Sequence, residues 1–372
     1  MKMRLPWPGP HSLRIAIVCA VGWLAPVFKL WAADGFATQL AQVHPGDVIT
    51  VSGSHRGEFV TSVDGTANAP ITIMGDGSAL LLGASRDDPV LTIKHAYYRV
   101  RNIAVRGGQK GIYVTGAHGV LDGLQVSDTQ EEGFTFKRAG ARYWLVRNCS
   151  VQRTGLAGKY GEGFYVGDAT SNWLSDRPDT PGYITFYNCY AADTVNDAWD
   201  FKEGAHHLKI INCTADMRTL QPLPVSSLPY DHTGLYCRAD GVQCINFKVE
   251  NLSEGHDLHG IGLHRGRGRD GIIYGHDIEL KRVDAENIPR GALIYVEDSS
   301  MRARVYDDCT VRDVGNFFAA RSAQVASASA ETFVEMTWNG EGGEVWGGTG
   351  GPAGAFGYSI GLTPASGVDA KR

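Results

Sequence analysis

Apolar and polar residues alternate within seven short segments in the middle of the chain. Each segment has apolar residues at its second and fourth positions. An alternation with a period of two is typical of strands that are buried on one face. We therefore expect the second and fourth residues to point into a core and the third and fifth to point outward. The segments are Gly111–Thr115, Gly133–Lys137, Gly163–Gly167, Ala198–Lys202, Gly234–Arg238, Gly260–His264 and Ala292–Val296.

A second pattern repeats along the same part of the chain, a mostly polar residue followed by an apolar one. The intervals between these pairs run from 21 to 40 residues. The shortest fit one coil of a parallel β-helix, and the longer ones fit a coil with an inserted loop. We expect the asparagines to stack at one corner and to hydrogen-bond from coil to coil. The pairs are Asn102-Ile103, Gly123-Leu124, Asn148-Cys149, Asn188-Cys189, Asn212-Cys213, Asn251-Leu252, Arg282-Val283 and Asp308-Cys309.

The sequence on either side of the repeats predicts how the fold ends. Residues 36–43 have the pattern of a short amphipathic helix, and 47–51 and 70–74 have the pattern of strands. The coil pattern then fades near the C-terminus, although 331–338 again resembles a strand. The helix is expected to cap the first coil.

Composition favours one elongated all-β domain. The chain has 47 glycines and few helical patterns, so turns are frequent and long helices are not expected. We predict a right-handed parallel β-helix, a solenoid with its N-terminal cap, over residues 34–322. Residues 323–372 are expected to form a Gly-rich cap or extension.

The first 33 residues have the charged start, apolar middle and small-residue end of a secretory signal. The apolar stretch is too short for a typical membrane span, and an uncleaved anchor is the alternative. Removal of residues 1–33 takes away four basic and no acidic residues, which changes the formal net charge from −5 to −9. An acidic protein argues against general nucleic-acid binding. We predict a secreted, periplasmic or cell-surface monomer without stable membrane insertion.

Cysteines occur at equivalent positions of successive repeats. Cys149, Cys189, Cys213 and Cys309 each follow an Asn or Asp and precede a Ser, Tyr or Thr. Six cysteines remain after residue 33, and an even number in a secreted protein invites a disulfide interpretation. The repeated inward position favours the other interpretation, in which they are buried as small apolar residues.

The outward fifth residues of five segments form a largely basic column. Lys202, Arg238 and His264 would occupy successive strands, about 4.8 Å apart. Their mutual repulsion would favour a neutral Lys202, which could act as a base, and an acidic ligand would relieve it. The column consists of Lys137, Gly167, Lys202, Arg238 and His264.

The neighbouring outward positions add tyrosines and carboxylates. Tyr165, Asp200 and Tyr236 are third residues of their segments, beside the basic column. Glu162, Asp168 and Asp197 lie close to the strand ends of two adjacent coils, which predicts a calcium site. Ion pairing of these acids with the basic residues is the alternative. No organic cofactor is expected.

Further sequence belongs to loops around the same coils. The insertions 151–162, 169–182, 216–233 and 253–259 are expected to form the walls of a groove over the basic column. Arg265 opens the turn Arg265-Gly-Arg-Gly-Arg269, which either contacts an anionic chain or is a solvated bend.

At this point the sequence resembles a family. Asp197-Ala-Trp-Asp-Phe-Lys-Glu-Gly204 and Gly234-Leu-Tyr-Cys-Arg-Ala-Asp-Gly241 are similar to the Lys and Arg strands of right-handed β-helix polysaccharide lyases of the alginate lyase and chondroitinase B group. The resemblance implies that Lys202 is the base, that Arg238 assists as acid or stabiliser, and that Asp197 binds calcium. Val195 and Ala239 stand where the family has a second metal-binding Glu and a His.

These observations predict an enzyme that cleaves an acidic, uronate-containing polysaccharide by β-elimination. Lys202 would remove the proton, Arg238 would neutralise the carboxylate, and Tyr165, Tyr236 or His264 would protonate the leaving oxygen. Lys137, Asp200 and Arg265 are the predicted substrate-binding residues.

Three other functions fit the same residues. A uronate epimerase would share the proton abstraction. A glycoside hydrolase would use two carboxylates such as Asp168 and Asp200. A noncatalytic carbohydrate-binding or surface protein would use Tyr165, Trp173, Trp199 and Tyr236 as stacking surfaces, although the alternation points Trp199 inward.

Overall fold

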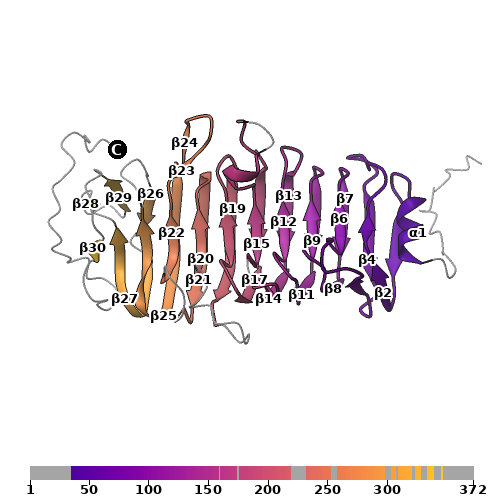
Figure 1. The fold of residues 1–372 in the computed structure, drawn as a ribbon, viewed down its shortest axis with the longest axis horizontal. Helices are drawn as coiled ribbons and strands as arrows, with labels where there is room; N and C mark the ends of the chain where they lie inside the picture. Colours follow the sequence, from indigo (N-terminus) through magenta and orange to yellow (C-terminus); the bar gives the residue numbers. More distant parts are fainter. Residues whose placement is uncertain are drawn as a thin grey trace, which may run out of the picture.

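Parallel strands stacked side by side make up almost all of the molecule (Figure 1). The computed structural model describes residues 35–158, 160–173, 176–218, 232–252, 258–297, 303–306, 309–320, 323–327, 333–338 and 345–346. The predicted signal, residues 1–33, lies outside these ranges, as does most of the predicted extension over 323–372.

The seven predicted segments lie on consecutive coils in one parallel sheet, which we call the first sheet. Phe134 pairs with Ile112 and with Phe164, and Phe164 pairs with Trp199. These registers confirm the predicted parallel β-helix. The strands are β3 (Phe59–Val60), β6 (Leu91–Ile93), β9 (Ile112–Val114), β12 (Phe134–Phe136), β15 (Phe164–Val166), β18 (Trp199–Phe201), β20 (His232–Cys237), β22 (Leu258–Leu263) and the end of β25 (Ile278–Val296).

Two further parallel sheets complete each coil, and the long strands β19, β21 and β25 run from one into the other. The second sheet contains β1 (Val48–Val51), β4 (Ile71–Gly75), β7 (Tyr98–Arg101), β10 (Gly119–Asp122), β13 (Arg142–Arg147), β16 (Gly182–Tyr187), β19 (His206–Asp216) and β21 (Asp240–Glu250). The third sheet contains β2 (Ser54–Gly57), β5 (Leu80–Gly83), β8 (Ala104–Arg106), β11 (Gln125–Ser127), β14 (Ser150–Thr154) and β17 (Tyr190–Thr194) before it joins β19.

The core runs along the inside of the coils. Phe134 stacks on Phe164 and Phe164 on Trp199, each pair with ring centroids 4.8 Å apart. The Trp199 side chain is fully buried, as its position in the alternation predicts. Rings of this size cost about 3–5 kcal/mol when truncated to alanine in a packed core. The stack therefore ties the coils of the first sheet together.

One predicted segment is displaced by a residue. Tyr295 was expected to point inward, but it pairs with Gly262 on the outward column, while Ile294 pairs with Ile261. The strand is thus one residue out of the expected register, which exchanges its two faces. Tyr295 lies on the outward face, buried in a small cluster with Ala292 and Ala319, so its predicted inward direction is wrong.

The corner between the second and third sheets carries the predicted asparagine ladder, with one correction. Asn246, not Asn251, follows Asn212 and donates to it at 2.8 Å, whereas Asn251 donates to Asp216. The Asn188 side-chain amide donates to Asn148 Oδ1 at 2.8 Å, and Asn148 donates to Asp122 Oδ1 at 2.9 Å. Asn148 and Asn188 both have φ +52°, the left-handed region that Asn tolerates better than most residues. Each asparagine thus adopts the backbone conformation of the turn, and its side-chain amide donates a hydrogen bond to the side chain on the preceding coil.

The cysteines are structural. All six in the described part of the chain are free and buried, which confirms the apolar interpretation. Burial raises the pKa of the Cys237 thiol to about 12. Such thiols are unreactive while the coils are closed.

The two ends of the solenoid differ from its coils. At one end α1 (Phe36–Ala41) buries Phe36 against Phe59, with ring centroids 4.9 Å apart, as the predicted cap requires. At the other end β29 (Phe333–Trp338) pairs antiparallel with β26 (Ala303–Tyr306) and β28 (Ala323–Ser327). Likewise β30 (Val345–Trp346) pairs antiparallel with β27 (Thr310–Ala320). Within the described ranges, no helix is long and apolar enough to span a membrane.

Candidate active site

The predicted basic column exists as a ladder of consecutive coils. The backbone amides of Lys202, Arg238 and His264 donate to the carbonyl oxygens of Val166, Phe201 and Cys237. Each acceptor is the fourth residue of the segment on the preceding coil, so the three side chains follow one another in register. Gly167 is held in the same way one coil before Lys202, and Lys137 two coils before it. A Cβ atom at Gly167 would lie 2.9 Å from the Lys202 Cβ. A glycine at that position therefore leaves room for the Lys202 side chain.

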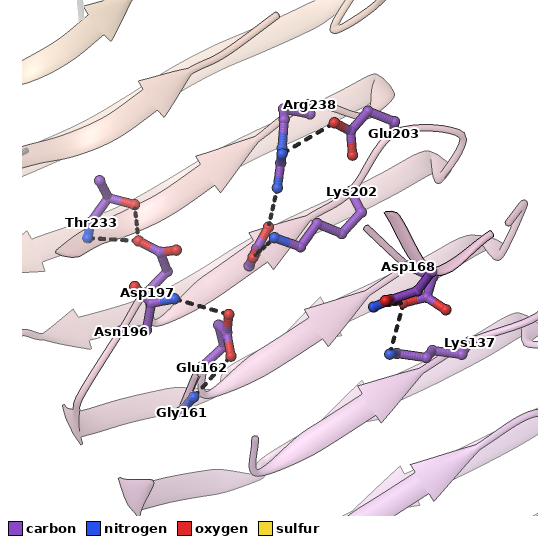
Figure 2. Close-up of polar contacts among 12 residues, drawn as sticks. Lys137, Gly161, Glu162, Asp168, Asn196, Asp197, Lys202, Glu203, Thr233 and Arg238 are labelled. Carbon is purple, nitrogen blue, oxygen red and sulfur yellow. Dashed lines mark hydrogen bonds and ion pairs between the residues drawn. The ribbon is translucent and has the colours of Figure 1, made fainter. Parts of the chain in front are cut away.

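Each cation of the column has its own carboxylate. Lys202 Nζ lies 2.5 Å from Asp200 Oδ2, and Arg238 Nη2 lies 3.9 Å from Asp200 Oδ1. Arg238 Nη1 also contacts Glu203 Oε1 at 3.1 Å (Figure 2). The expectation that repulsion between neighbouring bases dominates the column is wrong, because Asp200 and Glu203 lie between them. Burial opposes the charge of Arg238, but Tyr236, Glu203 and Asp200 outweigh it and raise its pKa.

Tyrosine rings separate the cations along the ladder. Lys137 Nζ lies 4.9 Å from the centroid of the Tyr165 ring, and Lys202 Nζ lies 5.1 Å from it. Arg238 lies 4.8 Å from the Tyr236 ring. Burial, with a smaller contribution from the nearby carboxylates, raises the pKa of Tyr165 well above its ordinary value. Tyr165 therefore keeps its proton.

A group of three buried carboxylates lies beside Lys202. Oxygen atoms of Glu162, Asp197 and Asp200 lie within 4.8 Å of one another. Asp197 accepts hydrogen bonds from the Thr233 amide at 2.8 Å and from its hydroxyl at 2.7 Å, and Glu162 accepts one from the Asn196 side chain at 2.9 Å (Figure 2). We call Glu162, Asp197 and Asp200 the acidic triad.

Asp168 does not join the triad. It contacts Lys137 Nζ at 3.0 Å and lies 3.9 Å from Arg138 Nη1 (Figure 2). Glu162 precedes β15 and Asp168 follows it, so six extended residues place them about 20 Å apart. Asp168 was predicted to bind the metal because it is close to Glu162 in sequence, but it lies too far away. Asp200, which was expected to contact substrate, is the third carboxylate of the group.

The triad fits a hard divalent cation. Burial first, and then the charges of Glu132 and Asp200, raise the pKa of Glu162 to about 7. A cation would offset that repulsion, and oxygen ligands are those that calcium prefers. Asp200 Oδ1 and Asn196 Oδ1 are buried without a hydrogen bond to any residue that the structure describes. Val195, which stands where the family has a second metal-binding Glu, is buried against Gly155.

The C-terminal end of the ladder contains one residue that the sequence did not assign to the site, Glu297. The His264 ring stacks on Tyr236 with centroids 3.8 Å apart, and its Nδ1 lies 3.2 Å from Glu297 Oε2. The Arg265 amide also donates to Glu297 Oε2, at 3.1 Å. Glu297 is the next residue of the same column, since its amide donates to Leu263. The correct register of the segment around Tyr295 would have identified it.

A hairpin and a loop meet beyond the ladder. The hairpin of β23 (Gly266–Arg267) and β24 (Ile273–Tyr274) includes the turn predicted to contact an anion. Tyr274 packs edge-on against Trp173 with centroids 6.5 Å apart, and Arg269 donates to Ser171 O at 3.2 Å. Trp173 is buried there, just after the short 3₁₀ helix η1 (Thr170–Asn172), so it is not the stacking surface that a carbohydrate-binding protein was expected to use.

The structure describes only some of the four predicted insertions. Most of 216–233 and 253–259 lies outside the described residues. In the insertion 169–182 the Trp173 indole donates to Asp168 O at 2.9 Å, and within 151–162 the Gly161 amide donates to Glu162 Oε2 at 3.0 Å. The groove that these insertions were expected to enclose stays a prediction.

Solved structures share this architecture. No family model matches the chain, and no curated protein matches its sequence. An alginate lyase from Paenibacillus sp. str. FPU-7 matches with a TM-score of 0.63 at 19% identity, over 76% of this chain and 94% of that one. The chain has the fold of the parallel β-helix polysaccharide lyases.

Two other lyases have the same fold as this chain. A pectate lyase matches with a TM-score of 0.53 at 15% identity, over 75% of this chain and 70% of that one. A rhamnogalacturonan lyase matches with a TM-score of 0.51 at 15% identity, over 70% and 69%. At these identities the likeness concerns the fold, and the chemistry has to be argued from the ladder itself.

Proposed function

We propose that the protein is a secreted polysaccharide lyase that cleaves a uronate-containing polysaccharide by β-elimination. The observation that carries this proposal is the placement of Lys202 and Arg238 on adjacent coils, beside a buried acidic triad. The solved structures with the same fold are named as lyases of alginate, pectate and rhamnogalacturonan. β-Elimination needs a base, a group that neutralises the uronate carboxylate, and a proton donor for the leaving oxygen.

Lys202 is the base in this proposal. Its Nζ lies 2.5 Å from Asp200 Oδ2, and Asp200 Oδ1 lies 3.9 Å from the Arg238 guanidinium, so the base and the cation that would neutralise the uronate are held side by side. Removal of the proton alpha to the uronate carboxylate then leaves an anion, which a cationic site stabilises.

Neutralisation of the uronate falls to Arg238 and the acidic triad. The Arg238 fork can bind a carboxylate through two parallel N–H bonds. Glu162, Asp197 and Asp200 would hold calcium, which when bound withdraws charge from the uronate carboxylate and acidifies the adjacent C–H. Lys137, which shares Asp168 with Arg138, would bind the carboxylate of a neighbouring sugar.

Tyr165 is the proton donor that the structure favours over Tyr236 and His264. Burial keeps it protonated, and it occupies the coil next to Lys202. His264 is stacked on Tyr236 and contacts Glu297, so both rings are already engaged. We assign Tyr236 and His264 to the positioning of Arg238 and of the substrate.

The other candidate functions are less well supported. The hydrolase would need Asp168 and Asp200 as free carboxylates, but each contacts a lysine within 3.0 Å. An epimerase would use the same Lys202 and return the proton to the opposite face, so its products distinguish it. Secretion rests on the sequence of residues 1–33.

The decisive experiment measures ultraviolet absorbance of the full chain with alginate, pectate, chondroitin sulfate and hyaluronan. Cleavage by β-elimination creates an absorbing unsaturated uronate, and we expect Lys202→Ala to lose at least about 10³-fold of that rate. Lys94→Ala is the matched control, because Lys94 is an exposed lysine after β6 in the same column. New reducing ends without absorbance would instead identify a hydrolase, and altered uronate configuration without cleavage an epimerase.

A further inference from the structure

A ladder of stacked aromatic rings runs along the corner between the first and second sheets. The rings belong to Tyr97, His118, Tyr143, Tyr183 and His207, which we call the aromatic corner. Successive ring centroids lie 4.8, 4.8, 5.0 and 4.6 Å apart, and the planes differ by at most 21°. All five residues have φ between +54° and +61°. One ring therefore stacks on the next at the spacing of the coils.

The ladder stops at Gly241. Leu208 pairs with Val242, so Gly241 occupies the position after His207. Its amide donates to His276 O, as the His118 amide donates to Arg142 O one residue before Tyr143. The next position after Gly241 is Asp277, with φ +55°. A single position of the corner thus lacks a side chain.

Nothing in the backbone requires glycine there. Gly241 has φ +65°, close to the value that the tyrosines and histidines of the aromatic corner adopt. A Cβ atom at Gly241 would lie 3.4 Å from its nearest neighbour, the His207 amide nitrogen, which is nearly ordinary contact. An added Cβ would therefore meet no severe clash, yet the chain stacks no ring on this face of His207.

The space beside that face is a cavity of about 420 Å³. Typical ligand pockets have volumes of about 300–1,000 Å³. His207 and Gly241 form one side, and Asp277, Lys209, Glu279 and Arg304 contribute polar groups around it. His207 is fixed in orientation by the contact of its Nδ1 with His206 Nδ1 at 2.9 Å.

We propose that this cavity binds the ring of a single pyranose sugar, stacked on His207 in the position that Gly241 leaves open. Coils lie about 4.8 Å apart, so the vacant position has the thickness of one ring. A pyranose presents an apolar face of C–H groups to the imidazole and hydroxyl groups that donate and accept at its rim.

The polar rim selects a sugar over a purely aromatic ligand. Glu279 is engaged by Gln243 at 2.9 Å and by Arg304 at 3.2 Å. Within the part of the chain that the structure describes, neither Lys209 nor Asp277 forms an ion pair. Hydroxyl groups would satisfy both the ammonium and the carboxylate, whereas an aromatic hydrocarbon would bury them at a cost.

The site is distinct from the ladder of Lys202 and Arg238 but lies on the same coils. His207 follows Lys202 by five residues and Gly241 follows Arg238 by three, around the corner of the solenoid. Binding of one sugar ring requires no cleavage. The inference therefore holds or fails separately from the proposed lyase activity.

Saturation-transfer NMR of the full chain tests the proposal with methyl β-glucopyranoside and methyl β-glucuronopyranoside as probes. We expect transfer to the axial protons of one ring face, and binding about tenfold weaker or worse in Gly241→Tyr, which extends the aromatic corner into the cavity. His207→Ala should lose the same signal. Gly53→Tyr is the matched control, since Gly53 has φ +69° and nothing within 4 Å of an added Cβ.

Three outcomes would overturn the proposal. The first is no transfer to either sugar in the native protein. The second is equal transfer in the native protein, Gly241→Tyr and His207→Ala, with unfolding temperatures showing that both variants are folded. The third is transfer only to benzyl alcohol, added as an aromatic probe.

Discussion

The asparagine corner and the outward face of the first sheet lie on the same coils, yet they stack different kinds of side chain. At the corner, like residues follow one another, and Asn188 donates to Asn148 as Asn246 donates to Asn212. On the first sheet, Tyr165, Asp200 and Tyr236 follow one another at a single position. An amide can both donate and accept, so a column of asparagines satisfies itself.

Charged groups have no such freedom, and a column of them needs a different partner at each step. Lys202 uses Asp200, Arg238 uses Glu203, and Lys137 uses Asp168. Removing one member of a buried pair leaves the other uncompensated, at a cost of about 3–5 kcal/mol. The asparagine corner therefore stabilises the solenoid. The outward face of the first sheet instead keeps charged side chains that could act on a substrate.

After the loss of Lys202, a change at Arg238 on the outward face of the first sheet should have the largest effect. Arg238→Ala removes the group that neutralises the uronate and leaves Glu203 without its partner. We expect the lyase rate to fall about 10²–10³-fold. Arg238→Lys should recover little, since an ammonium cannot form the two-pronged contact. Arg153→Ala, which removes an exposed partner of Asp128, is the control, and a rate within twofold of native in Arg238→Ala would contradict the assignment.

Removing the charge of Glu162 should change how stability depends on pH. Its folded pKa of about 7 exceeds the ordinary 4.5, so its ionisation costs stability as pH rises from 4.5 to 7 and costs nothing below that range. Glu162→Gln should therefore gain up to about 3 kcal/mol at pH 8 and almost nothing at pH 4.5.

Urea unfolding in the presence of a chelator measures both values. Glu58→Gln, at an exposed position after β2, provides the control and should show no such difference between the two pH values. An equal effect of Glu162→Gln at pH 4.5 and pH 8 would show that the acidic triad does not strain the fold.

Bound calcium should offset the destabilisation that the ionised Glu162 causes. At about 100 times its Kd, a cation that binds only the folded chain adds about 2.7 kcal/mol to the free energy of unfolding. We expect calcium to raise the midpoint of unfolding at pH 8 in the native protein but not in Asp197→Asn. A rise of the same size with magnesium, or in both proteins, would place the effect outside the triad.

Breaking the regular corner should have the smallest effect and none on activity. Asn188→Ala removes the ladder hydrogen bond to Asn148 and places an alanine at φ +52°, a left-handed conformation that alanine tolerates less well than asparagine. We expect a loss of about 1–2 kcal/mol in the free energy of unfolding with an unchanged rate. Asn188→Gly keeps the left-handed turn and should lose less. A changed rate in either variant would mean that the corner and the charged face are coupled.

Much of the fold could be predicted because every second residue of a strand that is buried on one face is apolar, which shows which side chains point into the core. That pattern identified β9, β12, β15, β18 and β20 and placed Lys202 and Arg238 in one column. It failed at Tyr295, where β25 pairs with β22 one residue away from the expected register and its two faces are exchanged.

The pairing of charges could not be predicted in the same way. Spacing along the chain does not say how far a side chain reaches across a coil, so Asp168 was grouped with Glu162 although they lie at opposite ends of β15. The hairpin around Tyr274 was also missed as a packing element, because its contact with Trp173 joins segments about a hundred residues apart.

The buried thiols give the solenoid a built-in reporter of its own opening. Burial raises the pKa of Cys237 to about 12 and that of Cys244 well above its ordinary value, so neither forms a thiolate in the closed coil. An alkylating reagent can reach them only when coils separate. The rate at which each thiol is modified would therefore record, coil by coil, how often the interior is exposed to solvent.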